Sequence, residues 1–191
     1  MIQRLVGSEM CIRDREGIKF SLLILGGDGI GYFYSKSEWL DLINNFSSFC
    51  KLRQTNPLFI TSTRTPIEVE ELIKEKFDVS MSVLYHSEKA RGKFDHLLYV
   101  ADNIFVTEDS STMLSEAVSS GKKVISIFPQ NINAPEKYLQ IITKYQGLEF
   151  IERCSIENID KFTFPRETNI QDKVDSSRKN FQRSLVERLK D

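Results

Sequence analysis

The 191-residue sequence lacks the features that mark several large classes of protein. Its three cysteines are widely spaced and odd in number, so they indicate neither a disulfide framework nor a metal site. No apolar run reaches the roughly 18 residues that a membrane-spanning helix needs. The net charge of -1 and the pI near 6.2 lack the basic excess of nucleic-acid-binding proteins. These absences favour a globular protein of the reducing cytoplasm without a nucleic-acid partner.

Three further absences concern motifs. The glycine run at residues 26–31 follows an apolar segment but matches neither GxGxxG nor the Walker pattern, so it predicts no dinucleotide or ATP site. No Tyr-xxx-Lys pair lies in a suitable helix, which disfavours an epimerase or a dehydrogenase. The two histidines, His86 and His96, have no partner pattern that marks a general base. The sequence therefore assigns no catalytic residue.

Residues 103–128 have the pattern of one complete β-α-β unit. Residues 103–107 and 124–128 are short apolar runs, typical of parallel strands that are covered on both faces. Between them, either Ser110 or Ser111 is a natural N-cap for a short helix, and Gly121 supplies its end. The carboxyl end of the first strand then directs a helix N-terminus towards a crevice at the edge of the sheet.

The start of this helix has the chemistry of an anion site. Free backbone N–H groups and the helix dipole attract phosphate. Three consecutive residues add hydroxyl donors: Ser110, Ser111 and Thr112. Glu116, about a turn and a half into the helix, can accept hydrogen bonds from a ribose diol. Capping alone also explains the hydroxyls, and the carboxylates of Glu108 and Asp109 would repel a phosphate unless they turn away.

Two other predicted strand-to-helix turns carry candidate residues. The first predicted strand ends in Gly26 and Gly27, where the backbone can approach a ligand closely. The second is followed by a hydroxyl-rich turn with Ser62 and Arg64, and a guanidinium can hold an anion through two hydrogen bonds. Ordinary turn chemistry remains the alternative at both places, with Arg64 in a surface ion pair.

Strand-like and helix-like segments alternate along the chain without hairpin signals. Strands are predicted at residues 18–25, 58–60, 81–85, 103–107, 124–128 and 148–151. Ser35 with Glu38 forms a predicted capping box for the first helix, and Thr65 is the predicted cap of the second, with Pro66 at its first position. The alternation predicts an α/β fold with a Rossmann-like, doubly wound and mostly parallel sheet. All the candidate turns then meet at one edge.

The runs ADNIFVTEDSSTMLSEAVSSGKKV and ITSTRTP resemble the mitochondrial-fission (elongated mitochondria) family and its bacterial relatives, which have a GT-B glycosyltransferase-like architecture. The resemblance implies that residues 16–191 are the C-terminal half of such a protein, with a crossover helix at about 168–190 and a missing N-terminal domain. It implies a nucleotide-sugar site, in which Phe94 packs on the base. The implied site residues are Gly26, Gly27, Ser62, Arg64, Phe94, Ser110, Ser111, Thr112 and Glu116.

The resemblance leaves two hypotheses for function. The first is the donor-binding half of a GT-B-like glycosyltransferase, which takes a nucleotide-diphosphate sugar as substrate, needs no cofactor or metal, and is inactive as a fragment. The alternative is a non-catalytic GT-B-like protein that acts by protein–protein interaction. Neither hypothesis requires a transmembrane segment, and peripheral membrane contact stays open.

Residues 1–15 differ in character from the rest of the chain. They show no clear period, and the tract LVGSEMCIRDR resembles a translated sequencing-adapter artefact. We therefore expect residues 1–15 to be non-native or disordered, and the natural sequence to begin near Glu16 in the middle of a longer protein. A genuine but poorly ordered N-terminal segment is the alternative.

Overall fold

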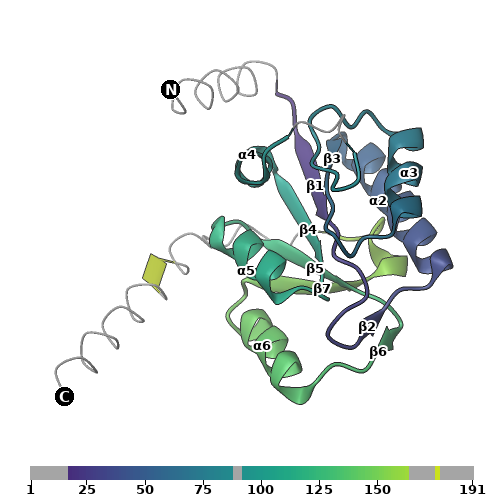
Figure 1. Cartoon of the computed structure of the whole chain (residues 1–191). Helices are drawn as coiled ribbons and strands as arrows, with labels where there is room; N and C mark the ends of the chain where they lie inside the picture. The colour runs from purple at the N-terminus through teal and green to yellow at the C-terminus, as the bar shows by residue number, and fades with distance from the viewer. Residues whose placement is uncertain (1–16, 88–91, 164–174, 177–191) are drawn as a thin grey trace.

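A five-stranded parallel sheet forms the centre of the molecule (Figure 1). The computed structural model describes residues 17–87, 92–163 and 175–176. The strand order is β3-β1-β4-β5-β7, and every neighbouring pair is parallel. The bounds are β1 (Phe20–Ile24), β3 (Asn56–Ile60), β4 (Asn103–Thr107), β5 (Val124–Phe128) and β7 (Ile151–Ser155). This confirms the predicted α/β, Rossmann-like fold.

The strand order reverses between β1 and β4. From β1 the chain goes to β3 at one edge of the sheet and then returns past β1 to β4. The register pairs Ile24 with Val106, so the residues that follow β1 and β4 emerge side by side. In open parallel sheets such a switch point is the usual place for a ligand crevice, because the two following connections leave in opposite directions.

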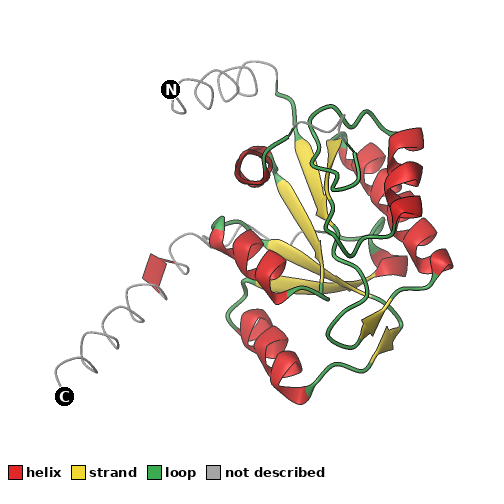
Figure 2. Ribbon diagram, in the orientation of Figure 1, coloured by secondary structure: helices red, strands yellow, loops and turns green. Residues whose placement is uncertain are grey.

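Helices cover both faces of the sheet (Figure 2). Figure 1 shows α4 and α5 on one face, and α2 and α3 on the other. The helices are α2 (Lys36–Arg53), α3 (Ile67–Lys76), α4 (Phe94–Val100), α5 (Ser111–Ser119), α6 (Glu136–Gly147) and the 3-10 helix η1 (Ile156–Asn158). Because the strands are covered on both sides, their apolar residues have almost no exposed surface. Phe105 lies at the centre, with Phe46 packed edge-to-face against it at 5.5 Å.

Two of the three predicted helix caps are confirmed. Ser35 and Glu38 form a capping box at the start of α2, and the Ser110 side chain accepts a hydrogen bond at the start of α5. The prediction for Thr65 was wrong: α3 starts after Pro66 and has no side-chain cap. The Thr65 hydroxyl instead donates towards the Gly26 carbonyl at 2.6 Å, because it is buried beside the end of β1, where that carbonyl needs a donor.

Short elements at the edges were missed or misplaced. A two-stranded antiparallel sheet of β2 (Tyr32–Phe33) and β6 (Asn131–Ile132) was not predicted, because two residues are too short for a period and the partners are far apart in sequence. The predicted strand at 81–85 is reduced to a single bridge between Ile60 and Val83. The predicted strand at 148–151 lies at Ile151–Ser155 instead.

The predictions for the chain ends fall almost entirely outside the described residues. Nothing described tests the expectation for residues 1–15. Of the crossover helix predicted at about 168–190, only residues 175–176 are described, and they are helical.

Candidate functional site

The start of α5 stands at the switch point of the sheet. Ser110 is its N-cap, and the Ser110 hydroxyl accepts the N–H of Met113 at 3.4 Å. Ser111 and Thr112 are exposed, and their N–H groups donate no hydrogen bond to the described part of the chain. Unsatisfied N–H groups, exposed hydroxyls and the positive end of the helix dipole therefore meet at one surface.

The carboxylate of Glu108 is turned away from this surface. It is fully buried and forms a bidentate ion pair with Arg153, with N–O distances of 2.6 and 2.8 Å. Tyr32 and Ser126 donate their hydroxyl protons to the same carboxylate at 3.0 and 2.9 Å. The hydrogen bonds to Glu108 raise the pKa of Arg153, so the guanidinium keeps its positive charge. The guanidinium also lies over the ring of Phe128, 4.4 Å from its centroid.

Asp109 is likewise held inside the chain. Its carboxylate accepts the Arg64 guanidinium at 2.7 Å and the Gly27 N–H at 2.9 Å. Burial raises the pKa of Asp109 above its usual range, although these hydrogen bonds and the charge of Arg64 oppose that effect. The two acidic residues that precede α5 are therefore each paired with an arginine rather than directed at the helix start.

The glycine turn after β1 fits closely against the same carboxylate. A Cβ atom on Gly26 would lie 2.0 Å from an oxygen of Asp109, and one on Gly27 would lie 2.1 Å from the Arg64 carbonyl oxygen. The Gly26 N–H donates to the Thr107 hydroxyl at 2.8 Å, and the Gly27 N–H to Asp109. Glycine is thus required at both positions because any side chain would collide with Asp109 or with the Arg64 backbone. Both N–H groups already have hydrogen-bond partners within the chain.

Ser62 and Arg64 lie against this glycine turn. The Ser62 hydroxyl donates to the Gly26 carbonyl at 3.1 Å. Arg64 bonds Asp109 through Nη2 and the Asp28 carbonyl through Nη1 at 3.3 Å. The Arg64 side chain is 37% exposed, and a guanidinium has five N–H donors, so donors remain on its open side.

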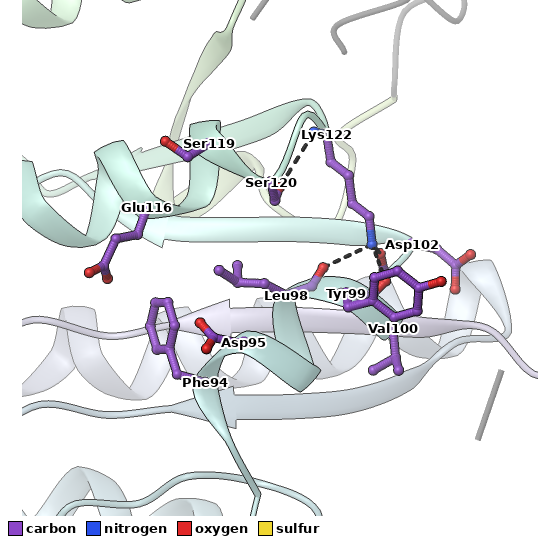
Figure 3. Close-up of a pocket in the computed structure, with 11 residues that line it drawn as sticks. Phe94, Asp95, Leu98, Tyr99, Val100, Asp102, Glu116, Ser119, Ser120 and Lys122 are labelled. Atoms are coloured by element: carbon purple, nitrogen blue, oxygen red, sulfur yellow. Dashed lines mark hydrogen bonds between the residues drawn. The ribbon is translucent and has the colours of Figure 1, made fainter. Parts of the chain in front are cut away.

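A groove of about 760 Å³ separates α4 from α5 (Figure 3). Its lining residues are Phe94, Asp95, Leu98, Tyr99, Val100, Ala101, Asp102, Glu116, Ser119, Ser120 and Lys122. Figure 3 shows Phe94 and Asp95 facing Glu116 across one end, and Lys122 at the other end. The Lys122 ammonium donates to the carbonyls of three residues at the end of α4: Leu98, Tyr99 and Ala101.

The predicted site residues thus fall into three adjoining groups. Three of them surround the Asp109 carboxylate, namely Gly26, Gly27 and Arg64, and Ser62 joins this group through the Gly26 carbonyl. Three form the start of α5: Ser110, Ser111 and Thr112. The remaining two, Phe94 and Glu116, meet at one end of the groove. Among the described residues, no group of three or more His, Cys, Asp or Glu is arranged to hold a metal ion.

Sequence reasoning missed the residues that hold the Glu108 carboxylate. Arg153 was not singled out, although a charged residue inside a short strand is a signal that it has a buried partner. Tyr32 was also missed, since nothing local marks its hydroxyl as a donor to Glu108. Asp109 was considered unfavourable for phosphate from the sequence alone, but in the structure its carboxylate binds both the glycine turn after β1, through Gly27, and the turn after β3, through Arg64.

The sheet order, the helices on both faces and the polar groups at the switch point define a Rossmann-like α/β protein. The sequence profile described as "Mitochondrial fission ELM1" matches residues 14–153. The chain therefore belongs to this family, as the resemblance predicted.

One relative is an uncharacterized protein of Rickettsia prowazekii (strain Madrid E), RP120, which is 31% identical over 122 residues. The match covers 61% of this chain and 33% of the relative, so the chain spans about a third of that protein's length. Within the described ranges, no helix is both long and apolar enough to cross a bilayer.

Proposed function

We propose that this chain is the nucleotide-sugar-binding half of a GT-B-like protein. The observation that carries the proposal is the pairing of Glu108 with Arg153 and of Asp109 with Arg64. Carboxylates beside a helix N-terminus would oppose a phosphate. Here both are buried and matched by cations, so the exposed start of α5 keeps its attraction for anions.

The diphosphate of the ligand sits at the start of α5 in this proposal. Exposed Ser111 and Thr112 supply N–H and hydroxyl donors. Arg64 contributes from the neighbouring turn through donors that Asp109 and Asp28 do not occupy. The N–H groups of Gly26 and Gly27 form hydrogen bonds within the chain. In this proposal the glycine turn therefore does not bind the ligand itself but positions Asp109 and Arg64.

The nucleoside lies in the end of the groove nearest to the α5 start. Glu116 is exposed one turn and a half beyond the cap, and its carboxylate accepts hydrogen bonds from the ribose diol. Phe94, half buried at the start of α4, offers its ring to the base. The sugar acceptor and any general base belong to the remaining part of a longer protein, and this chain alone has no transferase activity.

A second candidate is the non-catalytic member of the same architecture that binds a protein partner. The observation that favours it is the exposure of two apolar side chains at the small antiparallel sheet, Phe33 of β2 at 47% and Ile30 just before β2 at 43%. Exposed apolar residues near a ligand edge suit a protein contact. Nucleotide affinity separates the two candidates, because only the first requires it.

The test is calorimetric titration of the full chain with UDP, GDP, ADP and CMP, repeated on Glu116→Ala. We expect micromolar affinity for one nucleotide, weakened about 5- to 150-fold when the ribose contact is lost. Glu75→Ala is the matched control, because Glu75 is an exposed glutamate on α3, on the opposite face of the sheet. Absence of binding by a chain whose circular dichroism shows it folded would refute the donor-site proposal and favour the protein-binding candidate.

A further inference from the structure

We infer that the groove between α4 and α5 selects guanine, with Asp95 reading the base edge. The inference rests on the proposed function and adds to it the base of the nucleotide. It depends on the residues at the end of the groove where Phe94 and Asp95 face Glu116 (Figure 3).

The first step is the charge of the groove. Three carboxylates line it: Asp95, Asp102 and Glu116. Among the residues that the structure describes, Lys122 is the only cation that lines the groove, and its ammonium is bound to three backbone carbonyls at the end of α4. A lysine has three donors, so Lys122 has none left for a ligand. The groove therefore suits a neutral group that donates hydrogen bonds, and the phosphates belong at the start of α5.

The second step is the shape of the groove. Its lining includes apolar groups, among them Leu98 of α4 and Ala101 directly after that helix, which are 8% and 0% exposed. The ring of Phe94 stands at the same end as Asp95 and Glu116. A flat, partly apolar group can stack on such a ring while its polar edge meets a carboxylate. A nucleobase has that form.

The third step compares the edges of the four common bases. Uracil presents one N–H between two carbonyl oxygens, and these oxygens oppose a carboxylate. Adenine and cytosine each offer one exocyclic amino group beside a ring acceptor. Guanine alone offers a ring N–H next to an exocyclic amino group, so its two donors match the two oxygens of one carboxylate. With Glu116 on the ribose, Asp95 is the carboxylate that remains at this end.

The test is competition between nucleotides on the full chain and on Asp95→Asn. We expect GDP to bind the unchanged chain about 5- to 150-fold more tightly than UDP, ADP or CDP. Asparagine places an amino donor where one carboxylate oxygen was, which opposes the amino group of guanine and suits the carbonyl of xanthine. Asp95→Asn should therefore lose GDP affinity and gain affinity for xanthosine diphosphate. Both Asp95 and the control position Asp102 are exposed. The Asp102 carboxylate accepts the Phe20 N–H at 2.8 Å, and the amide oxygen of an asparagine can still accept it.

Asp102→Asn should leave the preference unchanged, because Asp102 lines the groove beyond the carboxyl end of α4. Equal affinity for GDP and UDP, with both weakened by Glu116→Ala, would overturn the guanine assignment and leave the donor site standing. A GDP preference that Asp95→Asn does not change would overturn the role of Asp95. A folded chain that binds no nucleotide would overturn both this inference and the proposed function.

Discussion

The buried ion pair between Glu108 and Arg153 gives the sharpest prediction about stability. Arg153→Met removes two charge-assisted hydrogen bonds of 2.6 and 2.8 Å and the counter-charge of a carboxylate that is 0% exposed. Of the side-chain donors to the Glu108 carboxylate in the described ranges, the hydroxyls of Tyr32 and Ser126 then remain. Breaking a buried pair costs about 3–5 kcal/mol, and the 30% exposure of the Arg153 side chain places this one at the lower end, about 3 kcal/mol.

Urea unfolding of the full chain, followed by circular dichroism, measures that loss. With a slope of about 2 kcal/mol per molar urea, a loss of about 3 kcal/mol lowers the midpoint by about 1.5 M. Methionine keeps much of the contact with the Phe128 ring, so the loss reports the charge rather than the packing. The double variant Glu108→Gln with Arg153→Met carries no stranded charge and should recover most of the loss. A single variant that costs under about 1 kcal/mol, or a double variant no better than the single, would refute the reasoning.

Three further predictions concern Asp109, the glycine turn and Lys122. Burial raises the pKa of Asp109 in the folded chain above its ordinary 3.8, so the folded chain binds this proton more tightly than the unfolded chain does. The resulting contribution to the unfolding free energy is fully present below pH 3.8 and is lost as the pH rises through the pKa of the folded chain. The unfolding free energy of the unchanged chain relative to Asp109→Asn should therefore fall as pH rises from 3.8 towards 7, and a rise would contradict the assignment. Gly26→Ala meets Asp109 at 2.0 Å and should cost about 1–3 kcal/mol in thermal unfolding, whereas Gly147→Ala has nothing within 4 Å and should be neutral or stabilising. Lys122→Met should lower the unfolding free energy by about 1–2 kcal/mol and speed amide hydrogen exchange in α4, because it removes the donor to three carbonyls at the end of that helix. Exchange rates equal to those of the unchanged chain would exclude a role of Lys122 in holding the end of α4.

The sequence was most informative where structure depends on near neighbours. The unit from β4 to β5 was predicted with its strand bounds, because apolar runs of strand length flank a hydroxyl cap and a helical stripe. The capping box at Ser35 is equally local. Thr65 shows where that logic fails. It has the residue type and position of an N-cap, but its hydroxyl bonds the Gly26 carbonyl in the glycine turn after β1 instead.

The arrangement of the candidate site was less accessible to sequence reasoning. Glycines in a turn predict a close approach, but not whether the approaching group is a ligand or the chain itself, and here Asp109 and Arg64 fill the space. The direction of the two acidic side chains depends on arginines that lie 45 residues away on either side of the pair. The groove depends on the spacing between α4 and α5, which no local pattern encodes.

The contacts of Glu108 and Asp109 also set the order in which this edge of the protein can be built. Asp109 meets Gly27 across 82 residues, and Glu108 meets Arg153 across 45. At a synthesis rate of about 5–20 residues per second, Arg153 is made roughly 2–9 s after Glu108. Throughout that interval the nascent chain holds an acidic residue whose counter-charge does not yet exist, so it is costly to bury. The edge that would bind a ligand is therefore completed late, and a chain stalled before β7 leaves the unpaired edge of β5 open to chaperones and proteases.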